Sequence, residues 1–269
     1  MRLVESPQIF LIAQPKIDTD EVKRFLDVIG AGESGFAKRL ELHDPDDPDG
    51  DSLVELAGRE CYRSWDVGLN PNVTRVRADQ YEYLGNVLSS GHGSVTEHPH
   101  YTFIFHDVSR VFTHELVRHR HENISQESMR FVRLTDIPFW FPEWARDDAE
   151  LMSRGVDLLE QMEEFQIWMA DHFGLDDEGV PFSVKKAKTS FMRRFAPDGV
   201  ATGMVWTANI RGLRHIISMR TDAGAEEEIR LVFDKVAQRL ATEIPGLFQD
   251  FERTEIDGIG QWKPAHWKV

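Results

Sequence analysis

The 269-residue chain has little of three features, and each shortage excludes a class of protein. Cysteine occurs once, at Cys61, so no intrachain disulfide can form and a reducing cytoplasm is the expected location. No apolar run is long enough to cross a bilayer and no charged-then-apolar leader opens the chain, so we expect no membrane association. Basic residues are also scarce, with 31 Lys and Arg against 46 Asp and Glu and a net charge of −15. Because nucleic-acid binding depends on neutralising phosphates, this balance argues against a nucleic-acid partner.

The remaining composition is ordinary for a globular protein, with 41% hydrophobic and 29% charged residues. Neither an internal repeat nor a convincing linker divides the chain. Alternating patterns predict strands within 6–17 and from Tyr101 onward. Helical spacing and capping residues predict helices over the ranges 20–30, 52–64, 78–90, 109–118, 148–173, 183–195, 204–224 and 225–244. We therefore expect an α+β fold, with one helix-rich domain around a modest mixed or antiparallel sheet.

Two local features suggest chemistry that the rest of the pattern does not support. Gly30, Gly32 and Gly35 spell GxGxxG, but too few residues follow before the next apolar segment for the helix of a dinucleotide-binding unit. Cys61 falls among the apolar positions of the helix 52–64, so we expect a small core residue rather than a nucleophile. The segment DPDDPDGD at 44–51 is predicted to be an acidic, turn-rich loop.

One segment gathers positive charge in this acidic chain. Residues 115–133 read ELVRHRHENISQESMRFVR, in which the triplet 118–120 is followed after seven residues by Ser128 and then by Arg130. On one continuous helix Arg118 and Arg120 would point about 200° apart and could not hold one ligand. Either they are ordinary charges on a solvated face, or the helix that Ser109 caps ends near Arg118 and the triplet lies in a loop.

A second cluster lies in the predicted helix over 204–224. Helical periodicity places Asn209 and Arg220 on one flank, and Arg211 and His215 on the other. These residues either lie on the solvated edges of a core helix, or they bind ligands. In the second case, each flank contacts a different ligand or a different copy of a site. Helices that serve two sites are natural in symmetric oligomers.

Together these motifs resemble a known family. The pattern RHR-x7-S-x-R closely resembles that of the flavin-dependent thymidylate synthases, which are distinct from the cysteine-dependent enzymes of the same name. GHGSVTEH at 91–98 is similar to the family's GHxTxxEH, with Ser94 in place of threonine. NIRGLRHIISMR at 209–220 resembles NxRxxxNxxxxR, with His215 where some members carry asparagine. Arg193 matches a further phosphate- or pyrimidine-contacting arginine.

The resemblance implies how the chain is organised and which residues bind ligands. We expect a single catalytic domain over 1–269, in which 1–50 is a variable N-terminal region and 91–220 carries the motifs. The residues that would contact FAD are Ser94, Arg118, His119, Arg120, Gln126, Asn209, Arg211 and His215. The residues that would contact dUMP are Glu115, Arg118, Gln126, Ser128, Arg130, Arg193 and Arg220. Both ligands carry phosphates, which planar guanidinium groups bind better than point charges do.

The resemblance also implies the reaction. It is the conversion of dUMP to dTMP by a cytoplasmic homotetramer with shared sites, with methylene-tetrahydrofolate as carbon donor and NADPH as reductant of the flavin. Arg220 is the expected catalytic residue, because a cation beside the uracil favours the deprotonated ring and raises electron density at the carbon to be methylated. Ser128 as a nucleophile is the alternative, although arginines are not the base that an alkoxide needs. His92 or Trp140 could stack on the folate.

Two other functions stay open from the residues alone. His119 and His121 form a plausible ligand pair for a His-rich metallohydrolase, although the flanking arginines repel a cation and no HExxH spacing occurs, so we expect no metal. A non-catalytic nucleotide- or RNA-binding module is the third possibility, and the net charge disfavours it.

Overall fold

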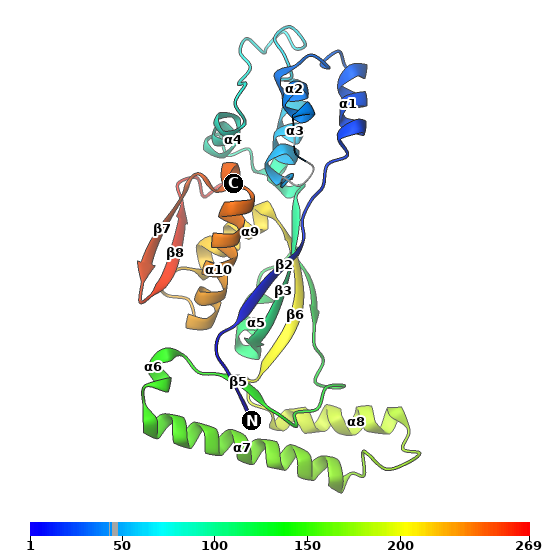
Figure 1. Cartoon of the computed structure of the whole chain (residues 1–269), viewed down its shortest axis with the longest axis vertical. Coiled ribbons are helices and arrows are strands. Elements are labelled where there is room, and N and C mark those ends of the chain that lie inside the picture. The colour runs from blue at the N-terminus through cyan, green and yellow to red at the C-terminus, as the bar shows by residue number, and fades with distance from the viewer. Residues whose placement is uncertain (43, 45–47) are drawn as a thin grey trace. The chain divides into compact units, whose positions relative to one another are not determined.

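The computed structural model describes residues 1–42, 44 and 48–269, and shows helices mixed with small sheets (Figure 1). The predicted α+β class is confirmed. The described strands form a parallel pair β1–β5, a four-stranded sheet in the order β2-β3-β6-β4, and an antiparallel pair β7–β8. None of the helices in the described ranges combines the length and apolarity that a bilayer crossing requires.

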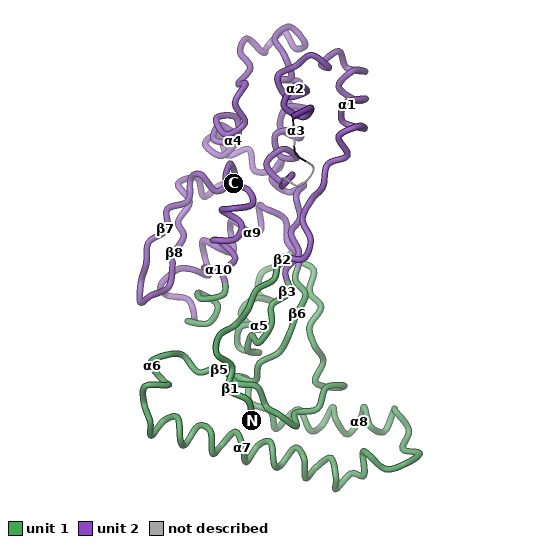
Figure 2. The backbone as a smooth tube through the Cα atoms, in the orientation of Figure 1, with its two compact units in different colours: residues 1–10, 104–206, 227–232 green, residues 11–103, 207–226, 233–269 purple. Residues whose placement is uncertain are grey.

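The chain folds into two compact units, which Figure 2 colours separately. Unit 1 comprises the ranges 1–10, 104–206 and 227–232, and unit 2 comprises 11–103, 207–226 and 233–269. Along the chain, four elements begin in one unit and end in the other: β2 (Gln8–Ala13), β3 (His100–Ser109), β6 (Ala201–Asn209) and α10 (Glu227–Glu243). The single catalytic domain over 1–269 stays a prediction.

Unit 1 is built around two long helices and several short elements. Its own elements are β1 (Arg2–Val4), α5 (Arg110–Leu116), β4 (Asn123–Gln126), β5 (Pro138–Trp140), α6 (Glu143–Arg146), α7 (Ala149–His172), α8 (Phe182–Met192) and the 3₁₀ turn η2 (Arg193–Phe195). α7 begins beside Asp148, where its start is predicted, and the Asp148 carboxylate caps it by accepting a hydrogen bond from the Leu151 amide at 3.0 Å. α7 and α8 then pack through Met169, Ala170 and Met192.

Unit 2 is mainly helical. Its own elements are α1 (Thr19–Val28), α2 (Gly35–Glu41), α3 (Gly50–Tyr62), α4 (Gln80–Ser89), the 3₁₀ turn η1 (Gly93–Glu97), α9 (Ile210–Arg220), α11 (Pro245–Phe248), β7 (Phe251–Ile256) and β8 (Ile259–Pro264). Leu26 and Phe36 bring α1 and α2 against the buried Trp65 ring. Gly35 therefore opens a short helix that packs on other helices, so the GxGxxG segment does not form a dinucleotide-binding unit, as predicted.

Strand β3 shows the alternation that its sequence predicts. Tyr101, Phe103 and Phe105 are fully buried on one face. On the other face, the Thr102 hydroxyl shares a 2.9 Å hydrogen bond with the hydroxyl of Thr207 in β6. Aromatic residues on one face and β-branched residues on the other are the composition that suits a half-buried strand.

The predicted helix over 204–224 is wrong in its first part. The chain is strand β6 up to Asn209 and helix α9 only from Ile210. Met204, Trp206 and Ala208 are buried at a period of two, which only an extended segment can achieve. Asn209 is consequently the N-cap of α9 and does not lie on a helix flank, so the argument that pairs it with Arg220 is also wrong.

The predicted inner face of α3 is wrong as well. Cys61 is exposed, and the helix buries Val54, Glu55, Gly58 and Arg59 instead. The cause is a buried ion pair, in which Arg59 Nε donates to Glu55 Oε1 at 2.7 Å and satisfies both charges inside the unit. Of the predicted acidic loop 44–51, residues 45–47 lie outside the described residues and Asp51 already belongs to α3.

Candidate active site

The cationic triplet lies in a turn after α5. The helix starts at Ser109, whose hydroxyl accepts from the Phe112 amide at 3.0 Å, and it ends at Leu116. His119 N still donates to the Leu116 carbonyl at 3.1 Å, which keeps the triplet close to the helix end. His121 then adopts a positive φ of 70°, and the chain turns into β4. The loop alternative is thus confirmed, and Arg118 and Arg120 are both exposed.

Gln126 at the end of β4 is tied back to α5. Its side-chain amide donates to the Thr113 hydroxyl at 3.2 Å, and that hydroxyl donates in turn to the Arg110 carbonyl at 3.0 Å. Glu115 lies in the same short helix, α5, and is half-buried. The structure therefore brings Gln126 to the helix that carries Glu115, through a hydrogen bond to Thr113 that no sequence pattern predicts.

Ser128 organises the next turn. Its hydroxyl accepts from the Arg130 amide at 3.3 Å, and its carbonyl accepts from the amides of Phe131 and Val132 at 2.9 and 3.0 Å. Because the oxygen accepts, the hydroxyl proton stays available to a ligand. Within the described chain, the buried Nε of Arg130 has no hydrogen-bond acceptor. A buried donor without an acceptor is rare and fits a site that an anionic ligand completes.

Arg193 is brought to the same turn. It opens η2 at the end of α8 and is exposed. With Met129 and Val132, on either side of Arg130, it lines a small cavity of about 10 Å³. Arg193 therefore lies in the same region of unit 1 as the residues that flank Arg130, although 63 positions separate the two arginines in the sequence.

In unit 2, the turn η1 and the start of α9 form a second group. Arg211 Nη1 lies 2.5 Å from the Glu97 carboxylate, and both side chains stay about half exposed. Gly93 permits this approach, because a Cβ there would lie 3.1 Å from Arg211 Nε. Ser94 is exposed on the same turn. Sequence reasoning missed the part played by Glu97, although the motif GHGSVTEH contains it.

The other predicted residues of α9 follow its geometry. The Asn209 side-chain oxygen accepts from the Gly212 amide at 2.9 Å and caps the helix. His215 is exposed one turn beyond Arg211 on the same flank, as predicted. Arg220 is the last residue of the helix and is half-buried. Convergence of the unit 1 and unit 2 residues on shared ligands stays a prediction.

Four arginines of unit 1 differ from Arg2, Arg133 and Arg154 of the same unit, because they lack a carboxylate partner among the described residues. Arg118, Arg120, Arg130 and Arg193 form no ion pair with any described residue. The chain has 46 acidic residues, so four unpaired arginines in two neighbouring segments are not explained by a shortage of carboxylates. Their arrangement fits an anion supplied from outside the chain.

Comparison with known proteins now decides the family. Residues 41–246 match the family model described as thymidylate synthase complementing protein. The chain is 37% identical over 220 residues to the flavin-dependent thymidylate synthase of Mycobacteroides abscessus, covering 78% of this chain and 83% of the relative. It is 34% identical over 209 residues to that of Mycolicibacterium gilvum, covering 77% and 82%. This chain belongs to the flavin-dependent thymidylate synthase family.

Membership in the flavin-dependent thymidylate synthase family makes the protein an enzyme, as predicted. The fold agrees with a solved structure, a UMP/dUMP methylase PolB from Streptomyces cacaoi bound with 5-Br dUMP. The TM-score is 0.62 with 92% of this chain and 95% of that chain covered, and at 16% identity this likeness concerns the fold alone.

The metallohydrolase alternative receives no support. Across the described ranges, His, Cys, Asp and Glu side chains never gather in threes as a metal site requires. Family membership likewise favours an enzyme over the nucleotide- or RNA-binding module.

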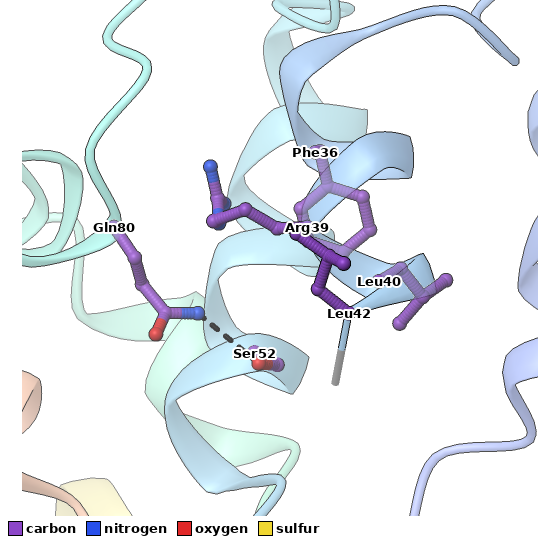
Figure 3. A pocket seen from close by; sticks show the side chains of 6 residues that line it. All are labelled: Phe36, Arg39, Leu40, Leu42, Ser52 and Gln80. Atoms are coloured by element: carbon purple, nitrogen blue, oxygen red, sulfur yellow. Dashed lines mark hydrogen bonds between the residues drawn. The ribbon is translucent and has the colours of Figure 1, made fainter. Parts of the chain in front are cut away.

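A pocket beside α2 carries none of the predicted residues (Figure 3). Its volume is about 260 Å³, and its described lining comprises Phe36, Arg39, Leu40, Leu42, Ser52 and Gln80. Figure 3 shows Gln80 pointing at Ser52, to which its amide donates at 3.1 Å. Arg39 is already paired with Glu55 at 2.5 Å. The described lining thus offers no unpaired charge to a ligand.

Proposed function

We propose that this protein methylates dUMP to dTMP, with FAD as redox cofactor, methylene-tetrahydrofolate as carbon donor and NADPH as reductant. The observation that carries the proposal is that Arg118, Arg120, Arg130 and Arg193 have no carboxylate partner among the described residues of a chain with a net charge of −15. Anionic ligands with several phosphate oxygens are the partners that such guanidinium groups fit. The family and the relatives' names support the same reaction.

The phosphate of dUMP is assigned to the turn at 128–130. The Ser128 hydroxyl keeps its proton for a phosphate oxygen, and the buried Nε of Arg130 supplies a charged donor. Arg193 adds a second guanidinium from η2. Gln126 and Glu115, on β4 and α5, are assigned to the same substrate.

FAD is assigned to the turn at 118–120 and to the group at η1 and α9, and the residues present fit it. Arg118 and Arg120, which have no ion-pair partner in the described part of the chain, offer their guanidinium groups to its pyrophosphate, and His119 and Gln126 are assigned with them. Arg211 uses only Nη1 on Glu97, so its other N–H groups can bind a phosphate oxygen. Ser94, Asn209 and His215 complete the assigned set. When bound and reduced, the flavin supplies the electron pair that turns a methylene unit into a methyl group.

Arg220 is assigned to polarisation of the uracil ring. A fixed cation beside the ring stabilises the negative charge that develops when the ring loses a proton. Ser128 is assigned to binding and not to nucleophilic attack. Its oxygen accepts from a backbone amide, and its described hydrogen-bond partners include no general base. The homotetramer with shared sites and the cytoplasmic location stay predictions.

The test is a dUMP-dependent NADPH oxidation assay on purified protein, with and without methylene-tetrahydrofolate. We expect a yellow protein that forms dTMP only when the folate is present. Arg220→Ala should lose nearly all turnover while flavin absorbance is retained, and Arg154→Ala, which removes an exposed arginine paired with Glu150, should leave turnover unchanged. Protein that binds neither FAD nor dUMP would overturn the proposal, and near-normal turnover of Arg220→Ala would overturn its catalytic role.

A further inference from the structure

Unit 2 contains a pocket that the assignments to FAD and dUMP do not use. It has a volume of about 350 Å³, and lies between the end of α3, the segment 72–77 and the second half of α4. The segment 72–77 is part of the long coil between α3 and α4, drawn in cyan in Figure 1. This volume lies in the range of small-molecule sites, which is roughly 300–1,000 Å³.

Buried Arg59 holds the walls of this pocket in place. Its Nη1 donates to the Ser64 carbonyl at 2.8 Å and its Nη2 donates to the Arg77 carbonyl at 2.7 Å. The guanidinium also lies 4.5 Å from the centre of the Tyr83 ring. One arginine therefore fixes both ends of the coil 64–77. A pocket whose walls are fixed before binding loses less free energy in ordering them.

The segment 72–77 gives the pocket an excess of positive charge. Arg75 and Arg77 both approach the single carboxylate oxygen Glu82 Oε1, each at 3.5 Å. That distance is long for a charged hydrogen bond, which is typically about 2.7–2.9 Å. By contrast, Arg59 holds Glu55 at 2.7 Å. Two guanidinium groups that share one distant carboxylate can both donate hydrogen bonds to an anionic ligand.

An aromatic pair lines the same pocket. The rings of Tyr62 and His92 lie 5.1 Å apart and are tilted by 60°. Asn70 fixes the backbone at Tyr62 by donating from Nδ2 to its carbonyl at 2.7 Å. His92 immediately precedes η1, the turn that carries Ser94. The pocket thus combines a surface for a flat ring with two donors for an anion.

We propose that this pocket binds an aromatic ring that carries an anionic group, supplied by one of the two co-substrates of the reaction. The source is either the p-aminobenzoyl-glutamate tail of methylene-tetrahydrofolate or the adenosine 2′-phosphate of NADPH. Arg75 and Arg77 bind the carboxylate or phosphate, and Tyr62 and His92 contact the ring. This inference rests on the proposed function, because that function supplies the two candidate ligands.

The test is a calorimetric titration of two probes, p-aminobenzoyl-glutamate and adenosine 2′,5′-bisphosphate, into flavin-loaded protein. One probe should bind, and its Kd should rise about tenfold or more in the double variant Arg75→Ala, Arg77→Ala. Arg24→Ala removes an exposed arginine paired with Glu21 and should leave that Kd unchanged. The probe that responds identifies the source. Binding of neither probe, or equal binding by the double variant, would overturn the proposal.

Two further measurements keep the result clear. Tyr62→Leu should raise the Kd for the ring-bearing probe but not the Kd for inorganic phosphate. This difference separates a contact with the ring from attraction by charge alone. If the double variant does not fold, Arg75→Ala replaces it, because the Arg75 side chain is 78% exposed and its removal is expected to change the stability little.

Failure of this inference differs from failure of the proposed function. If wild-type and variant proteins bind flavin and dUMP and turn over with unchanged KM for both co-substrates, only the pocket assignment is wrong. If the wild-type protein binds neither flavin nor dUMP, the proposed function is wrong. The titration, repeated on the unloaded protein, then still decides whether the pocket binds a ring with an anion.

Discussion

Unit 2 and unit 1 hold their key arginines in opposite ways. In unit 2, Arg59 and Arg214 are each 1% exposed and each is paired, with Glu55 at 2.7 Å and with Asp250 at 2.9 Å. In unit 1, the arginines of 118–130 and Arg193 are exposed or half-buried and have no carboxylate partner in the described chain.

This difference separates arginines that stabilise the fold from arginines that are available to a ligand. A buried guanidinium must be neutralised within the chain, since an uncompensated buried charge is costly. A partly exposed guanidinium is solvated and can stay unpaired until an anion arrives. The comparison therefore predicts that substitutions in the first group change stability, and that substitutions in the second group change binding.

The largest effect is expected from Glu55→Ala. This substitution leaves the buried Arg59 without its carboxylate, so the free energy of unfolding should fall by about 3–5 kcal/mol. Urea denaturation followed by circular dichroism measures it. The control is Glu21→Ala, which removes the exposed partner of Arg24 and should cost at most about 1 kcal/mol. Equal losses in the two variants would show that burial does not distinguish them.

The next effect concerns Asp234 and depends on pH. Burial alone would raise the pKa of this carboxyl, but hydrogen bonds from Arg253, Trp262 and the Gly260 amide outweigh it and lower the pKa to about 2. The unfolded pKa is higher, so this carboxylate stabilises the fold above pH 4 and its contribution is lost as the pH falls toward 2.

Asp234→Asn should remove that dependence. Between pH 4 and pH 2 the wild-type protein should lose about 2 kcal/mol more of unfolding free energy than the variant does. Urea denaturation at pH 4, 3 and 2 measures both proteins. Equal losses of unfolding free energy in the two proteins would mean that the three donors do not stabilise the Asp234 carboxylate.

The smallest effect is expected from Ser128→Ala. The substitution removes one hydroxyl donor to the phosphate, so the Kd for dUMP should rise about fivefold while methylation continues. Fluorescence titration and the dTMP assay measure the two quantities. A variant that binds dUMP normally and forms no dTMP would restore the nucleophile hypothesis.

The sequence predicts elements best where a local signal agrees with the final packing. Ser109 is the predicted cap of α5 and makes the capping hydrogen bond, and α7 begins beside Asp148, where the helical pattern predicts its start. The alternation from Tyr101 to Phe105 likewise decides β3 without help from distant residues.

The wrong predictions occur where the alternating pattern of a strand runs directly into the pattern of a helix, or where polar groups are buried. Met204, Trp206 and Ala208 alternate, but the helical stripe of α9 follows at once and hides the boundary at Asn209. An Asn before a helical stripe is a cap signal and could have revealed it. The hairpin β7–β8, which lies outside the predicted strands, also carries a local signal in the turn Asp257-Gly258, where both residues have positive φ.

For the candidate site, the sequence predicts the residues but not their partners. The spacing of the triplet, Ser128 and Arg130 identifies the turn of unit 1, and the structure adds the unsatisfied Nε of Arg130. The ion pair between Glu97 and Arg211 joins residues 114 positions apart, and no local pattern predicts such a contact. The binding of shared ligands by both units stays a prediction.

One measurement addresses the role of the unpaired arginines most directly. It is the calorimetric titration of dUMP into flavin-loaded wild-type protein, Arg130→Ala and the control Arg154→Ala, with urea denaturation of each. Arg130→Ala should keep its unfolding free energy within about 0.5 kcal/mol of wild type and raise the Kd for dUMP at least about tenfold, with no change in the control. An Arg130→Ala protein that is several kcal/mol less stable and binds dUMP as tightly as wild type would contradict this role.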